Sequence, residues 1–361
     1  MIQFEGLCAN TFTAFLKLLH NSCLSSPTIS FRSGVRPPSG NMFSLWFGDA
    51  GMLILHAGNK SFRLPSCILA EQSSVIRNFL FYPNLATIQA EKHTCPAGGL
   101  SITLDDPEEA VEHFLRAVYD SGYFEPPPTP AFLDQILGIL SLGAKYDVPF
   151  LRKRALRHLE SGYPSTLQAY ESRKSLSTFP TVREYGQSYA ERSEDFDIAA
   201  TLSVLQVAHS VNARWILPSA YYECCMYSLK EILTHPKYLE LEAYLRDRIM
   251  IGYTNQLSAT HHTAVFLYES PAEACEEPFK CLEVRRSYAE TAGWINNCTN
   301  PIGVWEPEDW LCYLGDCCDI CIAKAKKTHA EAKEELWERL PDMYGLPAWE
   351  ILLAERQHAM D

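Results

Sequence analysis

The clearest hydrophobic pattern in the chain begins at residue 52. Two short β-prone runs, residues 52–56 and 60–64, flank the triplet Ala57-Gly58-Asn59. Glycine and asparagine tolerate positive φ, so the triplet predicts the turn of a β-hairpin. Farther along, residues 100–104 read Leu-Ser-Ile-Thr-Leu and alternate with period two, which predicts another strand.

Helical spacing of apolar residues lies between and after these strands. It predicts two short helices, one near residues 65–70 and one that starts after Ser73 as its N-cap. Asp106 at an N-cap, Pro107 at the first helical position and Glu109 as capping-box partner predict the start of a longer helix. Further apolar stripes follow at 111–118, 132–140 and 146–159. The order of strands and helices predicts an α+β domain over residues 45–165.

The rest of the chain predicts helices only. Residues 166–196 are rich in Ser, Arg, Glu, Thr and Tyr with few aliphatic side chains, and we interpret them as an inter-domain linker. Helical spacing returns afterwards and predicts an all-α C-terminal domain over residues 197–361. Gly345-Leu-Pro347 predicts a helix stop, after which Trp349 folds back. Residues 1–44 mix apolar patches with Ser, Pro and Gly and are expected to form a flexible arm.

Composition and charge narrow the class of protein. With 361 residues and 47% hydrophobic residues, the chain can bury substantial cores. A formal net charge of −13 disfavours general affinity for nucleic acid, because phosphates are usually met by a basic surface. The short basic clusters, such as Arg285-Arg286, are interpreted as solvated helix faces.

The sequence also indicates the cellular location of the protein and the redox state of its cysteines. No run approaches the roughly 18 apolar residues of a membrane span, and residues 1–40 lack the features of a secretory signal. We therefore expect an intracellular protein, in the cytoplasm or the nucleus, that does not insert into a membrane. Its thirteen cysteines should then be reduced unless a metal holds them.

Four of these cysteines predict a metal site. Cys318-Asp-Ile-Cys321 is a C-x-x-C motif, and Cys275 and Cys281 form an earlier pair. Two cysteine pairs supply the four ligands of a tetrahedral structural zinc ion. Cys317 could replace Cys318, because positions i and i+4 share a helix face as well. The alternatives are ordinary buried thiols, since free cysteine is among the most buried residue types, or a redox pair.

The sequence offers little support for an enzyme. It contains no G-x-S-x-G, no glycine-rich phosphate loop, no H-E-x-x-H and no dinucleotide fingerprint. We expect no catalytic site and no organic cofactor. The alternative is a cysteine nucleophile with His261, His262 or His329 as its base. His329 lies eight residues after Cys321, or about 12 Å along a helix, so these two side chains should not reach one ion.

Part of the chain resembles a known family. The run from Asp49 to Phe79, with Phe62 in the second strand and a Leu-Ala and a Ser-x-Val element opening the next helices, resembles the start of a BTB/POZ domain. Residues 114–124 and 142–151 look like a later helix with its Tyr-x-x-Gly turn and like the closing helix pair. The match covers residues 45–165, and the remainder looks like the C-terminal half of fungal proteins that carry a single BTB domain.

The resemblance implies a non-enzymatic protein that binds other proteins, self-associates, and acts as an adaptor or scaffold. Where the family commonly has a His-Arg or His-Lys pair, this chain has Pro65-Ser66, so the Asp/His contact of the dimer face lacks its second member. A narrower alternative is a substrate adaptor of a cullin-type ubiquitin ligase. Relatives of that kind carry a hydrophobic-x-Glu element, and Ile88-Gln-Ala-Glu91 is an imperfect version of it.

Overall fold

The computed structural model describes most of the chain after residue 50. The described residues are 51–81, 91–94, 100–175, 182–183, 194–291, 298–303, 305 and 307–361. The expected N-terminal arm, residues 1–44, therefore lies outside the described residues. So do Asp49 and residues 88–90, on which the dimer-face contact and the cullin-binding element partly depend.

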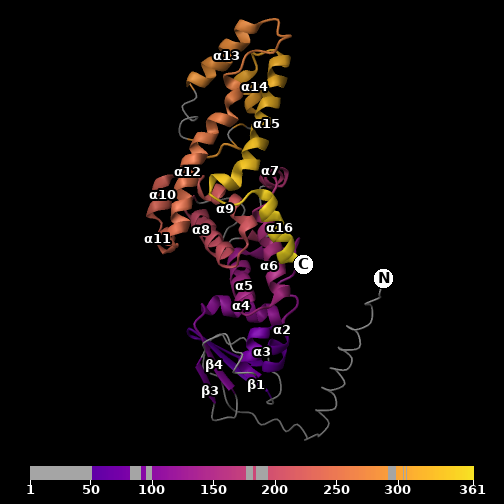
Figure 1. Cartoon of the computed structure of the whole chain (residues 1–361), viewed down its shortest axis with the longest axis vertical. Coiled ribbons are helices and arrows are strands. Elements are labelled where there is room, and N and C mark those ends of the chain that lie inside the picture. Colours follow the sequence, from indigo (N-terminus) through magenta and orange to yellow (C-terminus); the bar gives the residue numbers. More distant parts are fainter. Residues whose placement is uncertain are drawn as a thin grey trace, which may run out of the picture. The chain divides into compact units, whose positions relative to one another are not determined.

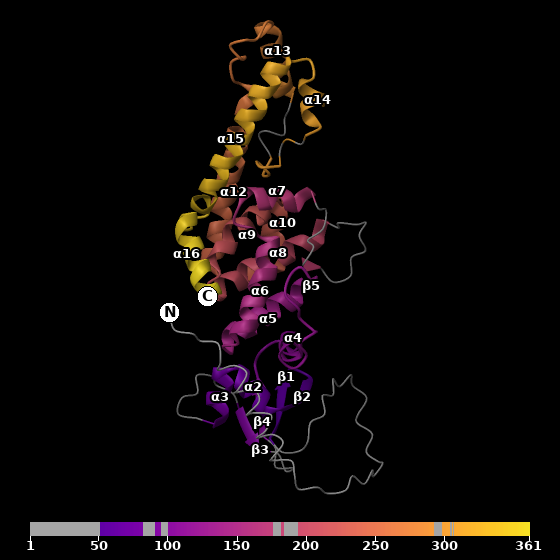
Figure 2. The ribbon, with the colours of Figure 1, turned by 90° about the vertical axis from the view of Figure 1, so that its right-hand side faces the viewer.

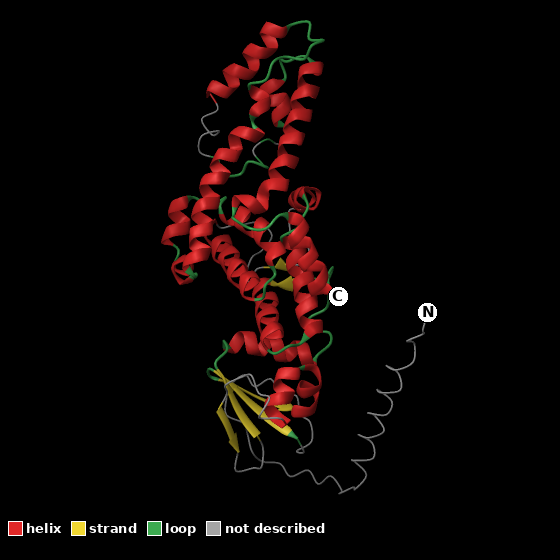
Figure 3. Cartoon of the chain, viewed as in Figure 1, coloured by secondary structure: helices red, strands yellow, loops and turns green. Residues whose placement is uncertain are grey.

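The predicted hairpin is the edge of a four-stranded sheet. β1 (Met52–Ala57) pairs antiparallel with β2 (Lys60–Pro65), and Gly58 takes a φ of +52° in the turn between them. β4 (Leu100–Leu104) lies parallel to β1, and β3 (Glu91–Thr94) pairs antiparallel with β4. The strand order is therefore β2-β1-β4-β3, and these strands lie together in Figure 3.

Helices follow the strands in the predicted α+β order. They are α2 (Ser66–Gln72), α3 (Ser74–Phe81), α4 (Glu108–Tyr119), α5 (Leu133–Lys145) and α6 (Pro149–Gly162). Ser73 acts as the predicted N-cap, because its Oγ accepts a hydrogen bond of 3.0 Å from the Ile76 N–H. A short β5 (Ala131–Phe132) precedes α5 and pairs in parallel with β6 (Val182–Arg183).

The predicted capping of α4 by Asp106 is wrong. α4 starts at Glu108 after Pro107, and no side chain caps it. The Asp106 carboxylate instead accepts hydrogen bonds from Lys145 Nζ, at 2.6 Å, and from the Tyr146 hydroxyl at the end of α5. A charged tertiary partner is a stronger attraction for this carboxylate than the helix N-terminus beside it. Asp106 therefore joins α4 to α5.

All described elements from residue 194 onward are helical. They are α8 (Glu194–Ser210), α9 (Leu217–Cys224), α10 (Leu229–Thr234), α11 (Pro236–Glu240), α12 (Ala243–Thr263), α13 (Pro278–Thr291), α14 (Asp309–Leu314), α15 (Asp319–Met343) and α16 (Trp349–Met360), with two short 3₁₀ turns, η2 (Arg214–Ile216) and η3 (Val265–Leu267). The long helices α12 and α15 lie side by side (Figures 1 and 2). Among the described residues, no helix is long and apolar enough to cross a membrane.

The predicted linker, residues 166–196, is structured where it begins. α7 (Leu167–Ser175) forms the first part of this interval, whereas the sequence predicted no helix there. Tyr170 of α7 is fully buried, with its ring 5.6 Å from that of Tyr222 and 5.2 Å from that of Trp337. Tyr170 and the partly buried Leu167 therefore attach this mostly polar helix to the larger hydrophobic core.

Within the described part of the chain, the buried hydrophobic side chains form two clusters. The larger one runs from Leu53 in β1 to Leu352 in α16 and includes Trp337 and Trp349. The smaller one contains Phe266, Trp305 and Trp310 together with several cysteines near the starts of α13 and α15. Tryptophans 305, 310, 337 and 349 are buried core residues, and Trp294 lies outside the described residues.

The C-terminal turn follows the prediction. α15 ends at Met343, and Gly345 has a φ of +64°, a conformation that glycine adopts without strain. Trp349 then folds back, so that its Nε1–H donates to the Trp337 carbonyl at 2.8 Å and the two indoles stack.

Candidate metal centre

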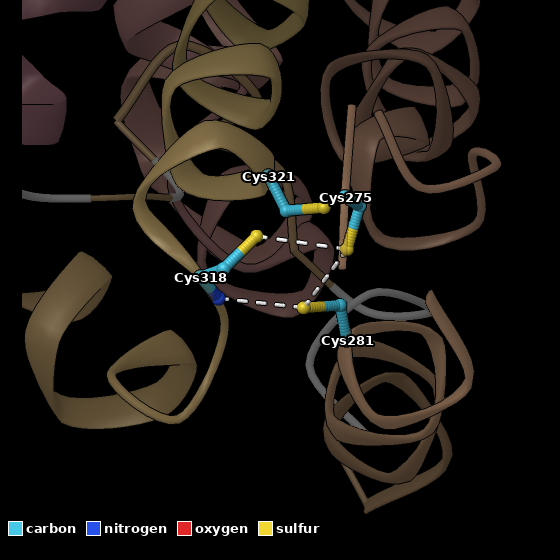
Figure 4. Close-up of side chains that lie close together, drawn as sticks. All are labelled: Cys275, Cys281, Cys318 and Cys321. Carbon is cyan, nitrogen blue, oxygen red and sulfur yellow. Dashed lines mark hydrogen bonds between the residues drawn. The ribbon is translucent and has the colours of Figure 1, made fainter. Parts of the chain in front are cut away.

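Two segments bring the four predicted cysteines together at the starts of two helices. Cys275 lies in the loop before α13, and Cys281 lies four positions into that helix, which begins at Pro278. Cys318 is the N-cap of α15 with extended backbone angles, and Cys321 lies in the first turn of the same helix. Figure 4 shows the first pair of thiols facing the second across the gap between the segments.

The sulfur atoms have the spacing of a metal site. All four lie within 4.8 Å of one another, and Cys275 Sγ is 3.7 Å from Cys281 Sγ and 3.6 Å from Cys318 Sγ. Tetrahedral zinc with bonds of about 2.3 Å requires sulfurs about 3.8 Å apart. The thiols are free, and the two shorter separations exceed the bond of about 2.05 Å in a disulfide. The four predicted residues therefore lie within metal-binding distance of one another.

Main-chain amides donate hydrogen bonds to the sulfurs. The Cys318 N–H donates to Cys281 Sγ at 3.3 Å, and the Ala272 N–H donates to Cys321 Sγ at 3.4 Å. A hydrogen bond from the Cys321 N–H lowers the pKa of Cys318, as expected for a thiol at a helix N-terminus. Desolvation, by contrast, raises the pKa of Cys275 and of Cys321 in the absence of a positive ion. A bound cation would favour the thiolate forms of Cys275 and Cys321.

Cys317 does not belong to this cluster. Its side chain is buried, and its Sγ–H donates to the Cys281 carbonyl at 3.6 Å. Burial raises the pKa of the Cys317 thiol to about 11, which favours the protonated donor. Of the two alternatives that spacing left open, the structure therefore selects Cys318.

The sequence did not predict the environment of Arg285. The interpretation of Arg285-Arg286 as a solvated face is correct for Arg286, which is exposed, and wrong for Arg285, which is 2% exposed. Its Nε donates to the Cys281 carbonyl at 3.3 Å, and its Nη1 donates to the Phe266 carbonyl at 2.9 Å. One signal in the sequence could have indicated this burial. Arg285 lies four residues after Cys281 and four before Ala289, both of which are buried, so the three residues share one helix face.

The three histidines considered as bases lie elsewhere. His329 is buried against Phe266 and Trp310, and its Nδ1 lies 2.8 Å from the Thr263 carbonyl oxygen. His262 is exposed with its Nε2 3.0 Å from a carboxylate oxygen of Glu335, and His261 is exposed as well. Among the described residues, the group that could hold a metal ion consists of the four cysteines and no histidine.

Comparisons of the chain with protein-family models, with curated proteins and with solved structures found no match.

Proposed function

We propose that Cys275, Cys281, Cys318 and Cys321 bind one zinc ion in a structural role. The observation that carries this proposal is the approach of four thiols from two separate segments to within 4.8 Å of one another. Thiolate ligands in a tetrahedral arrangement suit zinc, whereas magnesium and calcium prefer oxygen ligands. Four protein ligands also leave no coordination position for a substrate, which is typical of structural rather than catalytic zinc.

The ion would join two segments that no strand or continuous helix connects. It would attach the loop before α13 to the first turn of α15, beside the smaller hydrophobic cluster. An ion that binds only the folded arrangement adds its binding free energy to folding. The metal would therefore keep this end of the helical region ordered.

Metal analysis of the full chain tests the proposal. The protein is purified without added metal, and zinc is measured by inductively coupled plasma mass spectrometry against protein concentration. We expect about one zinc per chain, lost on incubation with a strong chelator. A preparation that contains no zinc and takes up none on titration would leave the cysteines as buried thiols.

We further propose that the chain is a non-enzymatic protein-binding protein whose residues 45–165 form a BTB-like module. The proposal is supported by the order β1, β2, α2, α3, β3, β4, α4, β5, α5 and α6, which contains the strand pair, the helix pair, the later strand and the closing helices that the resemblance implies. Where the family has a His-Arg or His-Lys pair, Ser66 donates from its N–H and its Oγ to the Gly51 carbonyl, at 2.8 and 2.7 Å.

Light scattering coupled to size exclusion tests self-association on the full chain. At tens of micromolar we expect a mass of twice the 40.8 kDa of the chain. A mass of 40.8 kDa at tens of micromolar would remove self-association from the proposal. The narrower role as a cullin adaptor is tested by a pull-down with the N-terminal domain of a cullin, and no retention at low salt counts against it.

A further inference from the structure

Arg285 is a buried cation for which the described residues supply no partner anion. It is the one Lys, Arg, Asp or Glu that is buried among the residues whose exposure the structure describes. Both of its hydrogen bonds go to neutral main-chain carbonyls, and its Nη2 is buried without a hydrogen-bond partner. Within the described part of the chain, Arg285 forms no ion pair with a carboxylate.

Such a side chain needs an opposite charge nearby. A guanidinium cannot lose its proton in a protein, so burial cannot neutralise Arg285. Removing an unpaired charge from water is strongly unfavourable, and a hydrophobic side chain of similar size would pack in its place at lower cost. The surroundings of Arg285 are the smaller hydrophobic cluster, which contains Phe266 and Cys281.

The proposed metal centre, one of whose ligands lies one helical turn before Arg285, would supply that charge. Four thiolates and one Zn²⁺ carry a net charge of about −2 by the ordinary charges of the ions. Arg285 lies one helical turn after the ligand Cys281 and hydrogen-bonds to its carbonyl oxygen, which also accepts the Cys317 thiol. The cation is thereby held on the helix face that presents the ligand.

From these contacts we infer that Arg285 is the internal counter-cation of the zinc–thiolate centre and sets its affinity for zinc. This inference rests on the proposed zinc site. Arg285 binds no metal itself; it offsets the excess negative charge and orients the Cys281 main chain. When zinc is bound, the negative charge of the centre compensates the Arg285 cation, which is unpaired when the metal is absent.

The test compares three variants of the full chain. Arg285→Met removes the charge and keeps much of the length, Arg285→Lys keeps the charge, and Arg286→Met removes the same charge from the exposed neighbouring position. Zinc affinity is measured by competition between the protein and a coloured zinc chelator. We expect Arg285→Met to bind zinc about 10- to 100-fold more weakly, as is typical for loss of an outer-shell partner. Arg286→Met should stay within about twofold of the wild type, and Arg285→Lys should lie between them.

Thermal unfolding with and without zinc distinguishes an effect of the Arg285 charge on the metal centre from an effect of the Arg285 side chain on packing. Arg285→Met should lower the unfolding temperature of the zinc-loaded chain. It should not lower that of the chelator-treated chain, because in the wild-type chain without zinc the Arg285 cation has no compensating charge to lose. The Arg285→Lys variant keeps the comparison decisive if Arg285→Met fails to give soluble protein. If the Arg285→Met and Arg286→Met chains bind zinc with equal affinity, the inference about Arg285 is overturned, while the proposed zinc site stands. An equal loss of affinity in Arg285→Lys and Arg285→Met, or an equal temperature shift in both metal states, also overturns that inference. A wild-type chain without zinc overturns the proposed metal site as well.

Discussion

Gly252 in α12 gives the sharpest structural prediction, because another element occupies the place of its missing side chain. A Cβ at this position would lie 2.1 and 2.2 Å from two ring carbons of Tyr344. Tyr344 is fully buried, stacks on Tyr221, and donates its hydroxyl hydrogen to Gln256 Oε1 at 2.6 Å. In Gly252→Ala the ring must therefore move by roughly 1.3 Å to restore ordinary contact.

The cost of this movement can be estimated from its parts. Overpacking a core costs about 1–3 kcal/mol, and a buried amide oxygen left without its donor costs a similar amount. Alanine is preferred over glycine inside a helix by about 1 kcal/mol, which offsets part of this. We expect a net loss of about 3 kcal/mol for Gly252→Ala, because the stacked ring of Tyr221 limits how far Tyr344 can shift.

Urea unfolding of the full chain, followed by circular dichroism, measures this loss. Gly122→Ala is the matched control, because Gly122 is exposed in a turn and the nearest atom to its added Cβ would be 3.5 Å away. The control should stay within about 0.5 kcal/mol of the wild type. An equally small effect for Gly252→Ala would refute the close packing of Tyr344 on α12.

The remaining predictions concern the metal centre and two tertiary contacts. Cys318→Ser should lower the zinc content of the purified chain, whereas Cys312→Ser, at an exposed cysteine outside the cluster, should leave it unchanged; equal content in both would argue against the ligand set. Burial lowers the pKa of His329 below its usual 6.5, so the unfolded chain binds the proton first and stability falls as pH drops through 6.5. His329→Asn should therefore flatten the decrease in unfolding temperature between about pH 7.5 and 6, and an unchanged slope would contradict the assignment. Glu160 accepts hydrogen bonds from Trp215 Nε1 at 2.7 Å and from Arg356 of α16 at 2.7 and 3.0 Å. Its replacement by alanine should cost about 2 kcal/mol in urea unfolding, and a neutral result would mean that these contacts do not hold α16.

Local signals in the sequence were sufficient for several elements. The turn at Gly58 and the helix end at Gly345 could be predicted because positive φ at each favours glycine whatever lies around it. The parallel pairing of β1 with β4 could not, because it joins strands separated by two helices. α7 was missed for a related reason, since its burial depends on Tyr222 and Trp337 from distant helices.

The ligand set was predictable and its surroundings were not. Cysteine is the soft ligand that zinc prefers, and two pairs of it were visible from residue type and spacing alone. The choice between Cys317 and Cys318 required the three-dimensional start of α15, where Cys318 is the N-cap and Cys317 faces the core. Arg285 was misassigned because its burial depends on a carbonyl of η3, at Phe266, that sequence spacing does not place.

X-ray absorption at the zinc edge tests the central claim most directly. On the full chain loaded with one equivalent of zinc, the account predicts four sulfur neighbours at about 2.3 Å, with no nitrogen or oxygen ligand required to fit the data. The four thiols that lie within 4.8 Å of one another are the source of those neighbours. A first shell dominated by nitrogen or oxygen, or a chain that retains no zinc, would contradict the proposed centre.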